Sequence, residues 1–158
     1  MSLQDARARL EELCVRSEQC SFDLRQKLVR WGVERGSHDG LIEALTSARF
    51  VDNGRFARAY VRDKYRFDRW GRMKIVRGLM AKRIDRATIN EALQEIDAKD
   101  YARNCFMLLK AKLRQIPAET ERYEAKQKLL RFGAARGYEA SLLLKLLDNE
   151  RLWASRKD

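Results

Sequence analysis

The chain has 158 residues, of which 45% are hydrophobic and 36% charged, with one proline and a formal net charge of +11. The scarcity of proline and the high charge favour long helices over a sheet-rich fold. No apolar run approaches the ~18 residues of a membrane span, and the polar amino terminus does not resemble a secretion signal. The positive charge predicts a polyanionic partner, and of the two candidates, nucleic acid and an anionic membrane, we expect nucleic acid. We expect the protein to be located in the cytoplasm.

An internal repeat organises the chain. Residues 27–36 read KLVRWGVERG, and residues 128–137 read KLLRFGAARG, which is identical at six of ten positions after a shift of 101. A weaker copy with a shift of 51 lies between them, since the Ala-Arg-Ala at 6–8 returns at 57–59. Self-similarity at a fixed period indicates one supersecondary unit used several times. The sequence therefore predicts three repeats, at residues 1–50, 51–97 and 98–158.

The first two repeats predict three helices each. Apolar residues at spacings of three and four predict an amphipathic helix at the start of each repeat. Within residues 1–50, Ser21 and Ser37 are expected to cap the second and third helices. Within residues 51–97, Asp52 and Asp85 are the expected caps, because a side-chain oxygen can accept hydrogen bonds from the first turn.

The third repeat is less regular. A longer helix is expected from Tyr101 to a connector near Pro117, followed by helices at 126–133 and 142–147. Trp153 follows the last of these helices, and its role is left open. The predicted fold is all-α, with nine helices in three tandem three-helix repeats that form an elongated, curved array.

Candidate catalytic and metal-binding residues are few. His38, the single histidine, stands beside Asp39 like half of a catalytic pair, but it lies at an expected helix start and a structural role is favoured. Cys14, Cys20 and Cys105 lack the paired spacing of metal sites and are expected to be free thiols. No Gly-rich phosphate loop occurs. We therefore expect no catalytic residues, no metal and no cofactor.

Basic residues are concentrated after the first repeat. Residues 1–50 carry eight basic and eight acidic side chains, residues 51–97 twelve and seven, and residues 98–158 fourteen and eight. At ~100° per residue, the first four arginines of the densest run share one helix face, which is unfavourable unless an anion binds there. An ordinary solvent-facing charged surface is the alternative. The predicted contacts to phosphates or an acidic protein are Arg55, Arg58, Arg62, Arg66, Arg69, Arg72, Lys74, Arg77, Lys82 and Arg83.

Three segments carry a family resemblance. They read SFDLRQKL at 21–28, FVDNGRFARAYV at 50–61 and WGRMKI at 70–75, and the last is followed by Leu79 and Lys82. Together they resemble the signature of the RecX family, bacterial proteins that modulate the recombinase RecA. Three positions depart from that pattern. An acidic residue, a proline and a glycine are usual in the family at the places of Asn53, Arg72 and Arg83.

The resemblance implies a function in DNA repair, homologous recombination and the SOS response. It implies a monomer that binds the RecA filament on single-stranded DNA and hinders filament growth, strand exchange and ATP turnover. Duplex DNA is a further candidate partner. The alternative is an autonomous regulator built from helix-turn-helix-like units, although the helices expected after Ser37 and Asp85 are not basic. An enzyme acting on nucleic acid would need a carboxylate or metal cluster that the sequence lacks.

Overall fold

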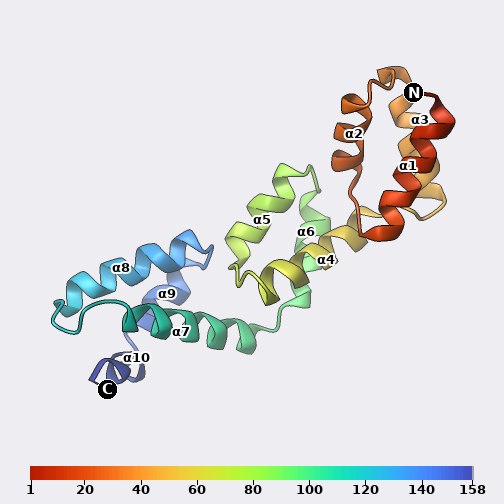
Figure 1. Cartoon of the computed structure of the whole chain (residues 1–158). Coiled ribbons are helices and arrows are strands. Elements are labelled where there is room, and N and C mark those ends of the chain that lie inside the picture. The colour runs from red at the N-terminus through yellow and green to blue at the C-terminus, as the bar shows by residue number, and fades with distance from the viewer. Residues whose placement is uncertain (158) are drawn as a thin grey trace. The chain divides into compact units, whose positions relative to one another are not determined.

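The computed structural model describes residues 1–157, and Asp158, the last residue of the third predicted repeat, lies outside the described residues. The all-α prediction is confirmed, because the described chain holds helices and no strand (Figure 1). The α-helices are α1 (Leu3–Arg16), α2 (Ser21–Arg30), α3 (His38–Ser47), α4 (Asn53–Arg66), α5 (Arg72–Ala81), α6 (Arg86–Ala92), α7 (Ala98–Arg114), α8 (Arg122–Ala135), α9 (Ala140–Leu147) and α10 (Glu150–Ala154). Short 3₁₀ turns are η1 (Arg35–Ser37), η2 (Leu93–Glu95) and η3 (Ser155–Lys157).

Aspartates cap α4 and α6 as predicted. Asp52 accepts a hydrogen bond from the backbone N–H of Arg55 at 3.0 Å. Asp85 accepts one from the backbone N–H of Thr88 at 2.7 Å. Each carboxylate thus satisfies one of the backbone donors that a helix leaves free in its first turn.

The predicted serine caps are wrong. The side chain of Ser37 makes no capping bond to α3. Helix α2 begins at Ser21 itself, and Cys20, at its N-cap position, makes no side-chain capping bond. Ser21 is engaged elsewhere, because its backbone N–H and its hydroxyl donate to Oδ1 of Asn53 at 3.0 and 3.3 Å. A tertiary contact therefore replaces the local cap.

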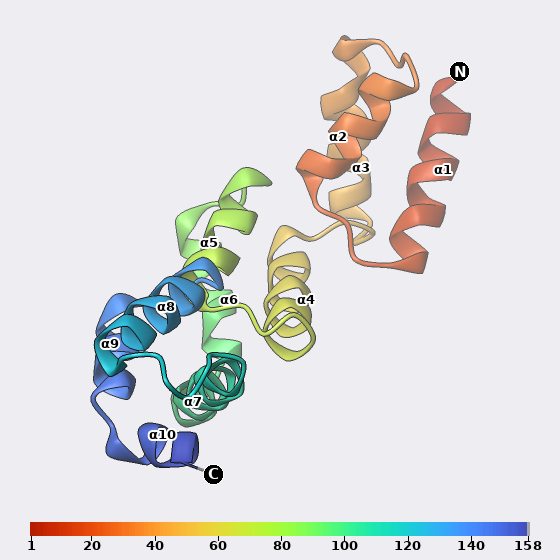
Figure 2. The same cartoon turned by 60° about the vertical axis from the view of Figure 1, so that its left-hand side comes forward.

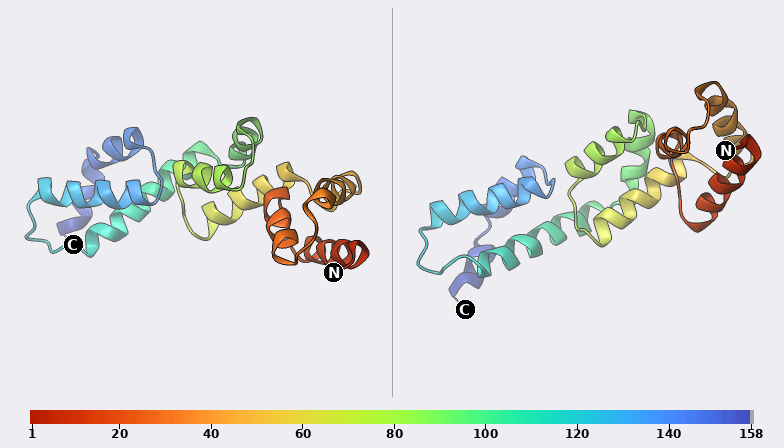
Figure 3. Two further views of the ribbon diagram at one scale, coloured as in Figure 1. Left: turned by 90° about the horizontal axis from the view of Figure 1, so that it is seen from above. Right: turned by 45° about the horizontal axis from the view of Figure 1, so that its top comes forward.

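The described chain divides into two units, and the division falls within α4 and α5. One unit comprises residues 1–60 and 79–92, and the other comprises residues 61–78 and those from 93 onward. The apolar stripes of α1, α2 and α3 meet in the core of the first unit, and Figure 3 shows these red and orange helices beside the N-terminus. The buried residues of that core are Ala6, Leu10, Leu24, Leu28, Val33, Leu41, Ile42, Leu45 and Val51.

In the second unit, α8 packs against α7 and α9, and α10 packs against α7 and α9 (Figure 2). The turn after α8 docks on the start of α5 at very short range. The backbone N–H of Gly71 donates to the Arg136 carbonyl at 2.7 Å, and a Cβ added at Gly71 would lie 2.3 Å from the carbonyl carbon of Gly137. Only glycine allows the two backbones to approach this closely.

The second helix of each repeat ends in the same turn. After α2, α5 and α8, the residues in left-handed conformation are Gly32, Arg83 and Gly137, with φ of 73°, 61° and 97°. The next residue is buried and donates its N–H to a carbonyl five positions earlier, which is the Schellman arrangement. Arginine at 83 adopts a conformation that glycine adopts without strain.

The structure corrects the register of the third repeat. The shift of 101 aligns Gly133 with Gly32, but Gly133 lies inside α8, which continues to Ala135. A Cβ there would lie 2.3 Å from the side chain of Leu143, so Gly133 serves the contact with α9. The prediction of nine helices is wrong as well, because the described residues form a tenth.

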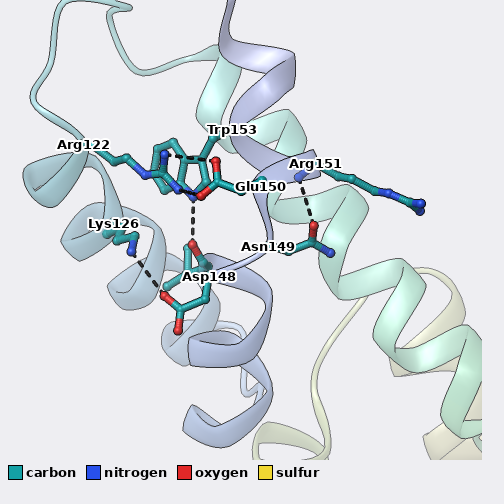
Figure 4. A network of polar contacts seen from close by, with 8 residues as sticks. Arg122, Lys126, Asp148, Asn149, Glu150, Arg151 and Trp153 are labelled. Carbon is teal, nitrogen blue, oxygen red and sulfur yellow. Dashed lines mark hydrogen bonds and ion pairs between the residues drawn. The ribbon is translucent and has the colours of Figure 1, made fainter.

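The tenth helix, α10, holds Trp153. The indole is buried, and its Nε1–H donates to the carbonyl oxygen of Leu147 at 2.8 Å (Figure 4). Arg122 of α8 bonds the Glu150 carboxylate at 2.7 Å and lies 4.7 Å from the Trp153 ring. Trp153 therefore anchors the end of the chain to the third repeat.

Candidate nucleic-acid interface

The ten predicted basic residues lie on α4, on α5 and in the segments after these helices. Arg55, Arg58, Lys82 and Arg83 belong to the first unit, and the other six belong to the second. Their surroundings differ, because some side chains meet a carboxylate or an aromatic ring and others meet neither. Whether they bind an external partner stays a prediction.

Arg55 is held inside the first unit. Its Nε lies 2.6 Å from Oε1 of Glu18, and its Nη2 donates to the carbonyl oxygens of Arg49 and Phe50 at 3.1 and 3.2 Å. The other carboxylate oxygen of Glu18 is buried without a hydrogen-bond partner among the described residues. Arg55 therefore ties the start of α4 to the segments that precede α2 and α4.

Lys82 forms a second internal contact. Its Nζ lies 2.9 and 2.8 Å from the two carboxylate oxygens of Asp23 on α2. Burial disfavours the charged amine, but the hydrogen bond and charge of Asp23 outweigh that effect and raise the pKa of Lys82 above its ordinary value. Lys82 therefore connects α2 with the end of α5.

In the second unit, Arg62 and Arg72 also meet carboxylates. Arg62 Nη1 lies 3.4 Å from Oε1 of Glu95. Arg72 Nη1 lies 3.0 Å from Oε2 of Glu139, and its guanidinium stands 4.0 Å from the centre of the Tyr101 ring. The protein thus supplies part of the negative charge that the arginine-rich run requires.

Tyr101 links these groups. Its hydroxyl accepts a hydrogen bond from the Arg72 N–H at 2.9 Å and donates one to Glu139. Burial, followed by the bond to the Glu139 carboxylate, raises the pKa of Tyr101 far above its ordinary value, so the phenol stays neutral. Sequence reasoning missed this cluster, because its members are separated by 29 and 38 residues.

Lys74 lies over an aromatic ring, with its Nζ 4.5 Å from the centre of Trp70. The remaining residues of the predicted set share two properties. They are exposed or half-buried, and they make no ion pair within residues 1–157. They are Arg58, Arg66, Arg69, Arg77 and Arg83, and we call them the unpaired arginines.

His38 is used structurally. It is buried, and its Nε2 lies 2.8 Å from the carbonyl oxygen of Val33. Its neighbour Asp39 forms an ion pair with Arg25 at 2.6 Å. The histidine and the aspartate therefore have separate partners and do not form a catalytic pair.

The three cysteines are free thiols. Burial raises the pKa of the Cys20 thiol to about 11 and that of Cys105 to about 12, which keeps both neutral and unreactive. The residues that the structure describes hold no group of three or more side chains suited to a metal ion. Within residues 1–157, no helix has both the length and the apolar character to cross a membrane.

Comparison with known proteins bears on the same region. Residues 52–93 match the family model described as RecX, second three-helix domain. This match covers α4 to α6, from which most of the predicted basic residues come.

Curated relatives carry the name Regulatory protein RecX. The protein from Clostridium perfringens (strain 13 / Type A) is 29% identical over 133 residues, which cover 81% of this chain and 62% of the relative. The protein from Clostridium beijerinckii is 28% identical over 149 residues, which cover 90% of this chain and 65% of the relative. The chain thus spans somewhat less than two thirds of the length of these relatives.

Solved structures share the fold. A crystal structure of regulatory protein RecX superposes with a TM-score of 0.83 at 20% identity and covers 92% of this chain and 73% of that one. RecX from Lactobacillus salivarius superposes with a TM-score of 0.78 at 16% identity and covers 96% of this chain and 99% of that one. The resemblance carried by the motifs at 21–28, 50–61 and 70–75 is thereby confirmed, because residues 52–93 match the RecX family model, the curated relatives are RecX proteins and the chain shares the fold of solved RecX structures.

Proposed function

We propose that this chain is a regulator that binds the RecA filament on single-stranded DNA and inhibits its ATP hydrolysis and strand exchange. The observation that carries the proposal is the match of residues 52–93 to the RecX second three-helix domain. The same segment contains all five unpaired arginines, so the region that identifies the family is also rich in uncompensated positive charge.

The basic residues fall into two groups by whether they have a carboxylate partner within the described chain. Arg55, Arg62 and Lys82 already have carboxylate partners, so a phosphate would have to displace an existing ion pair. The unpaired arginines can bind a phosphate or an acidic surface without that loss. Guanidinium groups suit this contact because they bind phosphate oxygens in a bidentate manner. We therefore assign the partner contacts to the unpaired arginines.

The proposed regulator has no turnover of its own. The residue types that most often act as general bases or nucleophiles are committed elsewhere, since His38 bonds a backbone carbonyl and Cys20 and Cys105 are buried. A protein that acts by occupying a surface needs affinity and charge rather than a reactive group.

Strand exchange between homologous DNA molecules tests the proposal. Purified chain added to a RecA reaction is expected to slow the formation of joint molecules. A double R66A/R77A variant should inhibit more weakly, whereas R30A/R35A should inhibit like the unsubstituted chain, because those exposed arginines lie in the charge-balanced first repeat. Normal strand exchange in the presence of excess protein would refute the proposal. Sequence-selective binding to duplex DNA in the same preparation would support an autonomous DNA-binding regulator.

A further inference from the structure

Phe67, directly after α4, points its side chain into solvent. It is 79% exposed, which makes it the most exposed of the large hydrophobic side chains in the described chain. Single exposed apolar residues are common on protein surfaces and need no explanation by themselves. Phe67 differs because the structure fixes the backbone that carries it and because it lies in a strongly basic segment.

The loop that carries Phe67 is firmly held. The backbone N–H of Phe67 donates to the Asp63 carbonyl at 2.9 Å, and that of Trp70 donates to the Lys64 carbonyl at 3.0 Å. These bonds fix the loop to the last turns of α4. The phenylalanine is therefore displayed by an ordered turn rather than by a frayed helix end.

The third repeat holds the same loop from its other side. Arg136 donates to the Asp68 carbonyl at 3.3 Å, and the hydroxyl of Tyr138 donates to the Arg69 carbonyl at 3.0 Å. Arg69 has a φ of 56°, a left-handed conformation that is unfavourable for a residue with a Cβ. Strained residues of this kind persist where the surrounding contacts enforce them, and they are found preferentially at functional sites.

The segment that carries the ring is strongly basic. Arg66 and Arg69, on either side of Phe67 in sequence, are exposed and unpaired. The next aromatic residue, Trp70, lies beneath the amines of Lys64 and Lys74, at 4.8 and 4.5 Å from its centre. Residues 61–78 contain seven basic side chains against two acidic ones, Asp63 and Asp68.

Tyr123 on α8 provides a natural comparison. Its side chain is 69% exposed, close to the value of Phe67. Its neighbours in sequence carry both signs, since Arg122 stands between Glu121 and Tyr123 and Glu124 follows, so the ring does not lie in a predominantly basic segment. Exposure alone therefore does not distinguish the two rings, but charge does.

We propose that Phe67 is a stacking platform for an unpaired base of a single-stranded nucleic acid, with Arg66 and Arg69 bound to the phosphates on either side of that base. Aromatic rings beside cationic side chains bind single strands in this manner, because every base has an exposed π-face once it is unpaired. A duplex keeps its bases stacked and paired, so this contact selects single strands over duplex. The inference rests on the proposed function in naming DNA as the nucleic acid of the filament.

The test measures DNA binding by the full chain in the absence of RecA. Fluorescence anisotropy with labelled oligo-dT, at several salt concentrations, gives the affinity and its dependence on salt. We expect F67A to weaken binding about tenfold and to leave the slope of log affinity against log salt unchanged. F67W should restore the affinity. R66A should instead reduce the steepness of the slope by about 0.7.

Y123A is the matched control and should bind like the unsubstituted chain, and far-ultraviolet circular dichroism should show the same helicity for every variant. Unchanged affinity of F67A for oligo-dT would overturn the inference. An equal loss on duplex DNA, or a loss of RecA binding without a loss of oligo-dT binding, would overturn it as well.

The measurement separates the inference from the proposed function. If F67A loses oligo-dT binding while the unsubstituted chain has no effect on RecA, the stacking platform stands and the RecA proposal fails. If the unsubstituted chain inhibits RecA but F67A binds oligo-dT normally, the platform fails and the RecA proposal stands.

Discussion

Residues 1–50 and 51–97 follow the same helical plan but use their charges differently. In the first segment, Arg7 bonds Glu11 and Arg16 bonds Glu12, both within α1. Arg25 of α2 bonds Asp39 of α3. Three of the eight basic side chains in this segment are thus paired within it, and the eight basic side chains are balanced by eight acidic ones.

In the second segment, three basic residues take their partners from other segments, and Arg62 and Lys64 find theirs within it. Glu18 and Asp23, which belong to the first segment, bond Arg55 and Lys82. Glu95 and Glu139 bond Arg62 and Arg72. After these pairs are made, Arg86 and the five unpaired arginines have no carboxylate partner within residues 1–157. Tertiary ion pairs therefore decide which part of a dense basic run is available to a partner.

The largest expected effect concerns the unpaired arginines. A variant with R66A and R77A should bind single-stranded DNA about tenfold more weakly at moderate salt, because two phosphate contacts are lost. Its free energy of unfolding should stay within about 0.5 kcal/mol of the unsubstituted value, as is usual for exposed positions. Anisotropy and urea denaturation measure the two quantities. A large loss of stability would show that these arginines support the fold.

R55A should have the opposite effect, because it should lower the free energy of unfolding rather than the affinity for DNA. Removing the guanidinium leaves the partly buried Glu18 carboxylate and the carbonyls of Arg49 and Phe50 without their donor. Because both charged side chains are about one third exposed, we expect a cost of about 1–2 kcal/mol rather than the 3–5 of a fully buried pair. Urea denaturation should detect it, and E18Q is the matched control for lost charge. Unchanged stability would contradict the structural role of Arg55.

Substitution of Lys82 should have a smaller effect, with a dependence on pH. The folded-state pKa of Lys82 lies above its ordinary value of 10.5, so its contribution is complete below that value and is lost as pH rises through the folded pKa. K82M should therefore cost about 1 kcal/mol at pH 7, and the difference from the unsubstituted chain should shrink above about pH 10.5. A difference that persisted at high pH would argue that packing, not charge, explains the cost.

The last expected effect is a gain. R83G places glycine at the left-handed position after α5, and the relief of strain should stabilise the fold by about 1 kcal/mol. Since Arg83 is also unpaired, the same variant should bind DNA slightly more weakly. Thermal denaturation would test the gain in stability, and anisotropy would test the loss of affinity for DNA. A loss of stability would show that the contact of the Arg83 guanidinium with the Phe22 ring, 5.7 Å from its centre, outweighs the relief of strain.

Much of the fold follows from local sequence. Apolar periodicity predicts the helices, and Asp52 and Asp85 cap α4 and α6 as short-range rules require. The register of the third repeat cannot be predicted from the sequence copy. KLLRFG closely resembles KLVRWG, but α8 continues past Gly133, whereas α2 ends before Gly32. Helix α8 ends instead at the Schellman turn of Gly137, which also docks on α5, and the repeat alone does not choose between Gly133 and Gly137.

The candidate site, like the fold, can be predicted only in part from the sequence. The sequence locates the basic run, but it does not distinguish Arg55 from Arg58. The partner of Arg55 lies 37 residues away, and that of Lys82 lies 59 residues away. Phe67 was not singled out, because an aromatic residue at a helix end is usually expected to be buried, and its exposure depends on the tertiary contacts of its loop.

The most direct test of the account is the rate of ATP hydrolysis by RecA on single-stranded DNA as this chain is titrated into the reaction. The account predicts a progressive fall in rate with the unsubstituted chain, a weaker fall with R66A/R77A, and an undiminished fall with R30A/R35A. A rate that stays constant up to an excess of the unsubstituted chain over RecA would contradict it.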